Sequence, residues 1–258
     1  MSTRPAVGDR AVAIHGWGFS SPVWRGFPEP GLFPGGFQVR SLPGYDGVEA
    51  GPPAHSVPDW AKRLAADAEG KPATWVGWSL GGLVAIDVAR AYPARVTSLI
   101  LIASTPRFQR HADWPNALAP DLLQTFKGTL TTAPTKTMAR FAALCAGTAT
   151  PHMRTVARQL RAVLDAPNPP SEETLQAGLN ALAEQDYREA LAGLRCPVLV
   201  ILGDNDPLVP AGVAEDIRAL NPGAQVRVLR DCAHAPFLSH PQECQRMIEE
   251  FLHGLAEG

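Results

Sequence analysis

The sequence has no apolar run as long as a membrane-spanning helix, which needs about 20 consecutive apolar residues. It also lacks a charge excess, because 23 lysines and arginines stand against 25 aspartates and glutamates, a formal net charge of −2. Proteins that bind nucleic acid usually carry a strong basic excess. The first residues lack the apolar stretch of a secretory signal. We therefore expect a cytoplasmic protein with neither nucleic acid nor membrane as a partner.

Cysteine is scarce. The four cysteines are Cys145, Cys196, Cys232 and Cys244, and none forms a C-x-x-C pair. Their scattered spacing does not indicate a zinc site, and in a reducing cytoplasm they are expected to be free thiols. We expect no metal and no cofactor. Cys232 lies close to a candidate catalytic histidine, but a small buried filler is its more ordinary role.

The chain has 258 residues, enough for one large domain with a full hydrophobic core. Apolar segments that predict strands alternate with segments of helical periodicity. The predicted strands are 11–14, 38–42, 73–78, 96–103, 197–202 and 224–230, and the predicted helices include 57–68, 80–91 and 241–255. Strands that are apolar on both faces and alternate with helices indicate an α/β fold with a parallel sheet covered on both sides.

The middle of the chain contains no convincing strand. Helix-like segments occur there at 121–130, 135–144, 154–164 and 172–184. We interpret residues 106–189 as a helical cap inserted into a core made of residues 1–105 and 190–258. Such a cap would lie over the carboxyl ends of the strands, where open α/β sheets bind ligands.

Residues 77–81 read GWSLG, which is the pattern G-x-S-x-G. The pentapeptide alone is weak evidence, and an ordinary glycine-rich turn is the alternative. Here it joins the predicted strand 73–78 to the predicted helix 80–91, the context that an exposed nucleophilic serine requires. The helix N-terminus also favours negative charge beside the serine. The sequence therefore predicts a serine hydrolase of the α/β-hydrolase fold, with Ser79 as its nucleophile.

A serine nucleophile needs a base, and in this fold the chain order is serine, acid, histidine. His234 follows the predicted strand 224–230 and precedes the last helix, so it can reach over the sheet to Ser79. His240 is the competitor, but it abuts Pro241 at the start of that helix, which favours a capping or surface role. His15 precedes the serine in the chain and fits a different role.

Two carboxylates follow the predicted strand 197–202, Asp204 and Asp206. The acid should orient His234 and stabilise its imidazolium form. Asp206 lies further out along the loop and is favoured, whereas Asp204 suits hydrogen bonding to the loop backbone. An oxyanion hole needs two N–H donors, for which the backbones of Leu80 and of Trp17, in the loop HGWG, are the candidates.

Several longer motifs carry a resemblance to a known family. They are HGWG at 15–18, GWSLGGLVA at 77–85, ASTPRF at 103–108, DWP at 113–115, RFAAL at 140–144, DPLVP at 206–210 and AHAPFLSHP at 233–241. On these motifs the chain resembles, over most of its length, the pimeloyl-[acyl-carrier protein] methyl ester carboxylesterases of biotin synthesis. That family hydrolyses the methyl ester of the pimeloyl group on acyl carrier protein and frees its distal carboxylate.

The resemblance implies a site and a partner. It implies the triad Ser79, Asp206 and His234, with the N–H groups of Trp17 and Leu80 at the oxyanion. It implies an acyl carrier protein as partner, and we expect the esterase itself to be a monomer. The acyl channel would be lined by five consecutive residues, Phe141, Ala142, Ala143, Leu144 and Cys145.

The charge pattern of the predicted cap bears on this partner. No aspartate or glutamate occurs from Leu122 to Leu164, while the stretch carries Lys127, Lys136, Arg140, Arg154, Arg158 and Arg161. Two pairs of these residues are four apart and share a helix face. Acyl carrier proteins are acidic, so a basic surface would steer their association. The resemblance implies that Lys136, Arg140, Arg154 and Arg158 contact the carrier, and a merely solvated helix face is the alternative.

Two other functions stay open. A broad-specificity short-chain carboxylesterase or a C–C bond hydrolase would use the same triad, because the fold hosts many chemistries. A non-catalytic binding protein on this fold is disfavoured by the intact serine, acid and histidine. Activity on the carrier-bound ester against p-nitrophenyl esters discriminates the first alternative, and fluorophosphonate labelling of Ser79 discriminates the second.

Overall fold

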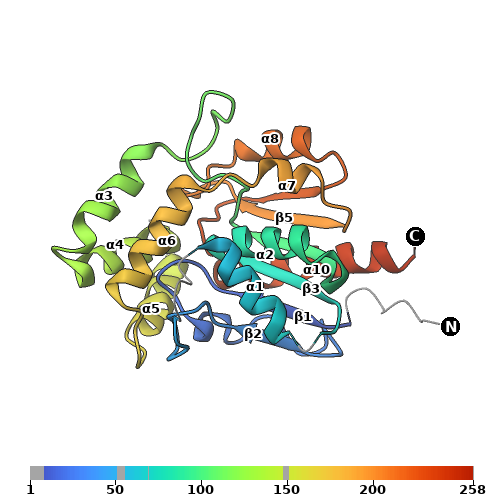
Figure 1. Cartoon of the computed structure of the whole chain (residues 1–258), viewed down its shortest axis with the longest axis horizontal. Coiled ribbons are helices and arrows are strands. Elements are labelled where there is room, and N and C mark those ends of the chain that lie inside the picture. Colours follow the sequence, from blue (N-terminus) through green and yellow to red (C-terminus); the bar gives the residue numbers. More distant parts are fainter. Residues whose placement is uncertain (1–8, 51–55, 69, 148–150, 258) are drawn as a thin grey trace.

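The structure, a computed structural model, describes residues 9–50, 56–68, 70–147 and 151–257, with only the backbone of residues 151 and 152. Residues 1–8, which bear on the expectation about a secretory signal, lie outside the described residues. Six strands form one parallel sheet in the order β2-β1-β3-β4-β5-β6 (Figure 1). The strands are β1 (Ala11–Ile14), β2 (Phe37–Arg40), β3 (Ala73–Trp78), β4 (Val96–Ile102), β5 (Val198–Gly203) and β6 (Gln225–Leu229). The predicted α/β architecture is confirmed.

The central strands are buried on both faces. Every residue of β1, β3 and β5 is buried, whereas the edge strand β2 is only half-buried. Two polar side chains in the core, Thr74 on β3 and Ser98 on β4, hydrogen bond each other at 2.9 Å between their hydroxyl oxygens. Near-continuous apolar strands are required here because helices exclude water from both faces of the sheet.

The helices of the core form two layers. The first contains α1 (Val57–Asp67), α2 (Leu80–Ala91), α7 (Arg188–Ala192) and α8 (Val213–Leu220), which contact one another in that order. The second contains α9 (Pro236–Ser239) and α10 (Pro241–Ala256), which pack against β5. Figure 1 shows α2 in front of the sheet and α10 behind it. Two short 3-10 helices complete the core, η1 (Ser21–Trp24) and η2 (Pro93–Arg95).

Local details agree with the sequence at one helix and differ at another. Ser56, a residue type that favours helix N-caps, caps α1, because its Oγ accepts a hydrogen bond from the Asp59 N–H at 3.3 Å. Helix α8 was not predicted. It is short, and its buried face consists of Val213, Ala214 and Ile217, the spacing of one helical stripe. No helix in the described part of the chain is long and apolar enough to cross a membrane.

Of the five helices that the structure describes between β4 and β5, the first four are called the cap helices. They are α3 (Pro120–Leu130), α4 (Pro134–Ala146), α5 (Pro151–Leu164) and α6 (Glu172–Glu184). Figure 1 shows them gathered beyond one end of the sheet, opposite the C-terminal end of α10. The described part of 106–189 holds no strand, only isolated bridges at Gln109–Leu118 and His111–Trp114.

The chain enters and leaves the cap helices at neighbouring points. The Tyr187 N–H donates to the Pro106 carbonyl at 2.8 Å, and Arg107 forms an ion pair with Asp186 at 2.5 Å. The helix that follows, α7, packs on α2 and α8 of the core. The division into a cap of 106–189 and a core of 1–105 and 190–258 stays a prediction.

Candidate active site

The turn around Ser79 is as tight as the motif predicts. Ser79 lies between the last residue of β3 and the first of α2, with φ 54° and ψ −119°, a strained backbone conformation for a residue with a side chain. A Cβ on Gly77 would lie 2.5 Å from the Gly81 carbonyl oxygen, and a Cβ on Gly81 would lie 2.5 Å from that of Ile14. Both glycines are therefore needed because backbone segments approach too closely for a side chain.

Three residues distant in sequence form one hydrogen-bonded chain above the sheet. The Ser79 hydroxyl donates to His234 Nε2 at 2.8 Å, and His234 Nδ1–H donates to Asp206 Oδ2 at 2.7 Å. All three are buried, and His234 is 0% exposed. The second oxygen of Asp206 accepts from the N–H groups of Leu208 at 2.7 Å and Val209 at 3.0 Å, so the carboxylate is held in place. A hydroxyl in this arrangement can act as an activated nucleophile.

The competing residues point elsewhere. Asp204 accepts a hydrogen bond from the Cys232 N–H at 3.2 Å, which is the loop role considered for it. His240 Nδ1 hydrogen bonds the hydroxyl of Ser239 at 2.8 Å. Burial raises the pKa of the Cys232 thiol to about 12, which keeps it protonated. The four cysteines are free thiols, and Cys232 is a buried filler beside the site.

The residue before the nucleophile holds the histidine loop. Trp78 Nε1–H donates to the His234 carbonyl at 2.7 Å, and the two rings lie 5.9 Å apart. Sequence reasoning did not find this contact. The motif places Trp78 beside Ser79, but only the fold brings it to a residue 156 positions later.

The loop HGWG approaches Ser79 from β1. A Cβ on Gly16 would lie 3.2 Å from the Ser79 Cβ, so the two turns are in direct contact. Within the described part of the chain, neither the Trp17 N–H nor the Leu80 N–H has a hydrogen-bond acceptor. Two unused donors beside the nucleophile are what an oxyanion hole requires.

His15 and Tyr45 fix this loop from the core side. His15 Nδ1–H donates to the Gly16 carbonyl at 2.9 Å, and His15 Nε2 accepts from the Leu42 N–H at 3.0 Å. Burial lowers the pKa of His15 to about 4, so the ring is neutral near pH 7. Its ring lies 4.6 Å from that of Tyr45, whose hydroxyl accepts from the Gly18 N–H at 3.2 Å. The different role expected for His15 is thus structural support.

A narrow cavity of about 10 Å³ lies beside Ser79 and His234. Its other walls are apolar or aromatic and come largely from the cap helices: Trp17, Phe108, Leu118, Leu123, Phe126, Phe141, Leu179, Leu182 and Leu208. Sequence reasoning named only Trp17 and Phe141 among these. The signal for the residues of α3 and α6 among the others was the apolar stripe of each helix.

Only one of the five predicted channel residues lines this cavity. Phe141 does so, whereas Ala143 is exposed, and Ala142, Leu144 and Cys145 are not among the lining residues. The five belong to one helix, α4, in which successive side chains point about 100° apart. The channel role of the other four residues stays a prediction.

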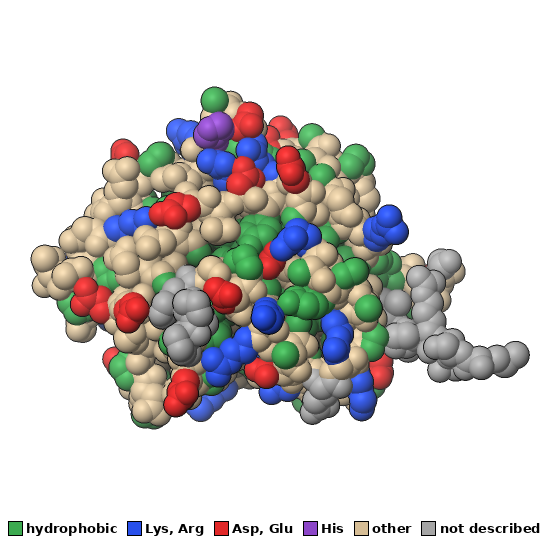
Figure 2. All heavy atoms as spheres, viewed as in Figure 1, with side chains coloured by type: hydrophobic (Ala, Val, Ile, Leu, Met, Phe, Trp, Pro, Cys, Tyr) green, Lys and Arg blue, Asp and Glu red, His purple; other side chains and the backbone are tan. Residues whose placement is uncertain are grey.

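The basic residues of α4 and α5 lie on the surface. Lys136 and Arg140 on α4 and Arg154 and Arg158 on α5 are exposed, and the two helices pack together. None of these four forms an ion pair with a carboxylate of the described residues. Lys127 differs, because it lies 3.7 Å from Glu184 of α6. Figure 2, by contrast, shows acidic and basic side chains interspersed on the face it draws.

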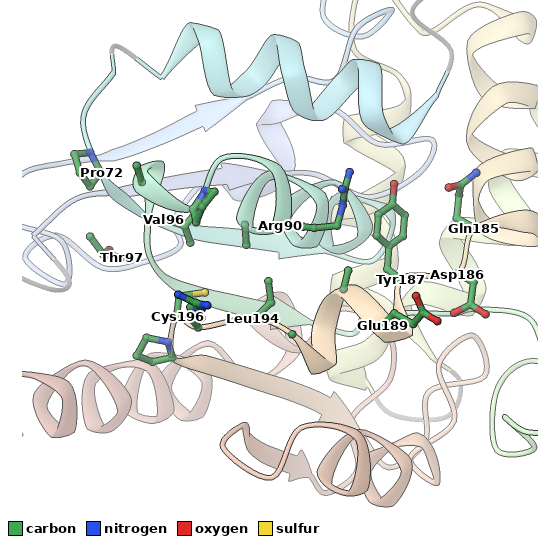
Figure 3. Close-up of a pocket in the computed structure, with 17 residues that line it drawn as sticks. Pro72, Arg90, Val96, Thr97, Gln185, Asp186, Tyr187, Glu189, Leu194 and Cys196 are labelled. Atoms are coloured by element: carbon green, nitrogen blue, oxygen red, sulfur yellow. The ribbon is translucent and has the colours of Figure 1, made fainter.

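Groove size does not identify the site. A wide groove of about 960 Å³ is lined by the end of α2, the start of β4 and residues of 185–197, including Arg90, Tyr187 and Cys196 (Figure 3). No triad, oxyanion or predicted channel residue lines it. A second groove, of about 640 Å³, runs between cap helices and is lined by Gly18, Met138 and Arg161 among others. The candidate active site is the smaller cavity, because Ser79 and His234 of the hydrogen-bonded triad line it.

Comparisons with known proteins agree with this geometry. A family model described as the alpha/beta hydrolase fold matches residues 12–241. A pimeloyl-[acyl-carrier protein] methyl ester esterase from Aromatoleum aromaticum is 38% identical over 94% of this chain and 98% of its own length. The protein of the same name from Serratia marcescens is 41% identical over 93% of this chain and 92% of its own length.

Solved structures show the same fold at lower identity. An esterase from Exiguobacterium antarcticum superposes with a TM-score of 0.81 at 18% identity, covering 96% of this chain and 93% of that one. A bromoperoxidase from Bacillus anthracis gives 0.82 at 21% identity, with the same coverage. The chain therefore belongs to the α/β-hydrolase family and, within it, to the family of the pimeloyl-[acyl-carrier protein] methyl ester esterases.

Proposed function

We propose that this protein hydrolyses the methyl ester of pimeloyl-[acyl-carrier protein] to pimeloyl-[acyl-carrier protein] and methanol, in biotin synthesis. The observation that carries the proposal is the buried hydrogen-bonded chain of Ser79, His234 and Asp206. It occurs in a chain that matches esterases of that name over more than nine-tenths of its length. No cofactor is needed for this chemistry.

In the first half of the reaction, Ser79 Oγ attacks the carbonyl carbon of the methyl ester. His234 Nε2 takes the hydroxyl proton along the 2.8 Å hydrogen bond, and the Asp206 carboxylate stabilises the resulting imidazolium. The tetrahedral intermediate collapses to an ester of Ser79. The methoxide leaves as methanol with the proton that His234 gives back.

In the second half, water attacks the acyl-enzyme. His234 takes a proton from the water and returns it to Ser79 Oγ as the acyl–serine bond breaks. The product leaves with a free distal carboxylate. In both halves the negative charge on the carbonyl oxygen is held by the N–H groups of Trp17 and Leu80.

The apolar walls of the cavity suit the methylene chain of the pimeloyl group. The cavity of about 10 Å³ holds roughly one water-sized molecule, so the cap helices must move for the acyl chain to enter. Phe141, on α4, lines this cavity. We assign the acyl-channel role to the cap face that includes Phe141.

The exposed basic residues of α4 and α5 suit the acidic carrier. Lys136, Arg140, Arg154 and Arg158 would attract it electrostatically and raise the association rate at low salt. We also propose that the enzyme acts as a monomer in the cytoplasm. Four free thiols are consistent with a reducing compartment.

The test is hydrolysis of purified pimeloyl-[acyl-carrier protein] methyl ester, with Ser79→Ala as the matched control. We expect turnover that Ser79→Ala abolishes, and complementation of a biotin auxotroph that lacks this esterase. The carrier-bound ester should also be hydrolysed with a far higher kcat/KM than p-nitrophenyl acetate. Near-wild-type turnover by Ser79→Ala would remove the triad assignment. A clear preference for the p-nitrophenyl ester would favour a broad-specificity carboxylesterase.

A further inference from the structure

Trp17 belongs to two parts of the molecule at once. Its backbone N–H, in the core loop HGWG, is a candidate oxyanion donor, while its indole is enclosed by three cap helices. The indole Nε1–H donates to the Leu175 carbonyl of α6 at 2.7 Å. The ring lies 4.6 Å from Phe141 of α4, edge to face, and 6.0 Å from Phe126 of α3. Trp17 is 0% exposed.

A glycine of α6 makes this contact close. A methyl group on Gly178 would overlap Trp17 Cδ1, would lie 3.1 Å from Nε1 of the same indole, and would lie 3.3 Å from Leu80 Cδ2. Gly178 is buried in the middle of α6, where glycine is unfavourable by helix propensity. Gly178 therefore lies against the side chains of both Trp17 and Leu80, the two candidate oxyanion donors.

We propose that α6 positions the oxyanion hole, with Gly178 and the Leu175 carbonyl as its positioning groups. The inference rests on the proposed serine-esterase function and deepens it. On the core side, His15 and Tyr45 hold the loop HGWG through Gly16 and Gly18. On the cap side, α6 fixes the indole of Trp17. The backbone N–H of Trp17 is thereby held in one orientation.

This arrangement couples access to catalysis. The cavity beside Ser79 is also lined by Leu179 and Leu182 of α6, so admitting an acyl chain displaces this helix. When α6 returns, the indole docks again and turns the Trp17 N–H toward the reacting carbonyl. Alignment of the oxyanion hole thus depends on closure of the cap, although neither positioning group touches the substrate.

The matched substitutions are Gly178→Ala and Gly128→Ala. Both place alanine in a cap helix, but a Cβ on the exposed Gly128 of α3 meets nothing within 4 Å. Helix propensity alone predicts that both variants fold at least as well as wild type. We expect Gly178→Ala to lower kcat for p-nitrophenyl acetate by about tenfold or more, since loss of a whole donor costs about 10²–10³. KM should change less than kcat, and Gly128→Ala should match wild type.

A second readout separates positioning from a general packing defect. An alkyl trifluoromethyl ketone forms a tetrahedral adduct with a nucleophilic serine, and its affinity should fall with kcat/KM in Gly178→Ala. Trp17→Phe removes the Nε1–H donor but keeps an aromatic ring, and it should show the same split between kcat and KM. If Gly178→Ala does not fold, Trp17→Phe still tests the positioning role.

Wild-type kcat in Gly178→Ala and Trp17→Phe would overturn the inference, as would a loss confined to KM. Because the assay uses a small free ester, it is independent of the carrier. If wild type fails on pimeloyl-[acyl-carrier protein] methyl ester and the Gly178→Ala effect remains, the proposed substrate is wrong and the positioning role stands.

Discussion

His15 makes the stability of this protein depend on pH in a predictable way. The imidazole is fully buried, and its Nε2 accepts a hydrogen bond from the Leu42 N–H. A proton on Nε2 would remove that acceptor and would place a positive charge in an apolar environment. Burial accordingly lowers the pKa of His15 from 6.5 to about 4.

The sign and size of the effect follow from this difference. The unfolded chain binds a proton at His15 below about pH 6.5, whereas the folded protein resists protonation until about pH 4. The stabilising contribution is therefore complete above the unfolded pKa and is lost as the pH falls through the folded one. The whole shift corresponds to about 3 kcal/mol of unfolding free energy, of which about 2 kcal/mol is lost by about pH 5.

The measurement is urea unfolding of wild type and His15→Gln at about pH 8 and about pH 5. The glutamine amide oxygen can still accept from the Leu42 N–H but does not titrate. Wild type should be the more stable protein at the higher pH, and its advantage should shrink by about 2 kcal/mol at the lower pH. Titrating groups that do not interact with His15 cancel in this difference. An advantage that is constant with pH would refute a neutral, buried His15.

The other predictions concern the triad, the tight turn and the carrier surface. Asp206→Asn should lower kcat by roughly 10⁴-fold in a folded protein, while Asp204→Asn should change kcat far less, both measured by steady-state kinetics. Gly77→Ala should fail to yield folded protein, as checked by circular dichroism, because its Cβ would lie 2.5 Å from backbone atoms. Joint replacement of Lys136 and Arg140 by glutamate should raise KM for the carrier-bound ester and weaken its salt dependence, with p-nitrophenyl acetate kinetics unchanged.

Elements with strong local signals were predictable from the sequence. The bounds of β3 and α2 agree with the prediction, because an apolar strand, a glycine-flanked serine and a proline after the helix mark each boundary locally. The insertion of helices between β4 and β5 was predictable for the same reason. Helix α6 also has its predicted bounds, and its N-cap residue Ser171 accepts from the Thr174 N–H.

Features that depend on distant contacts were not predictable. The Trp78 indole bonds a carbonyl 156 residues away, and the Trp17 indole bonds one 158 residues away. No local pattern carries such pairings. The same limit applies to the cavity walls, because motif resemblance pointed to consecutive residues of α4, whereas the walls combine Phe141 of α4 with side chains of α3 and α6. The sequence favoured Asp206 over Asp204 as the acid, and in the structure Asp206 Oδ2 accepts the hydrogen bond from His234 Nδ1–H.

The small cavity links specificity to rate. A triad that is almost fully buried under apolar cap side chains is shielded from water, which strengthens its hydrogen bonds but also closes it to substrate. Opening must therefore be driven by favourable contacts made elsewhere. Under the proposed function, the exposed basic residues of α4 and α5 would offer such contacts to an acidic carrier, and α4 also carries Phe141, whose ring lies 4.6 Å from that of Trp17. A partner that binds α4 and α5 would act on the helices that enclose the Trp17 indole. Binding of the carrier and alignment of the oxyanion hole would then depend on the same cap helices.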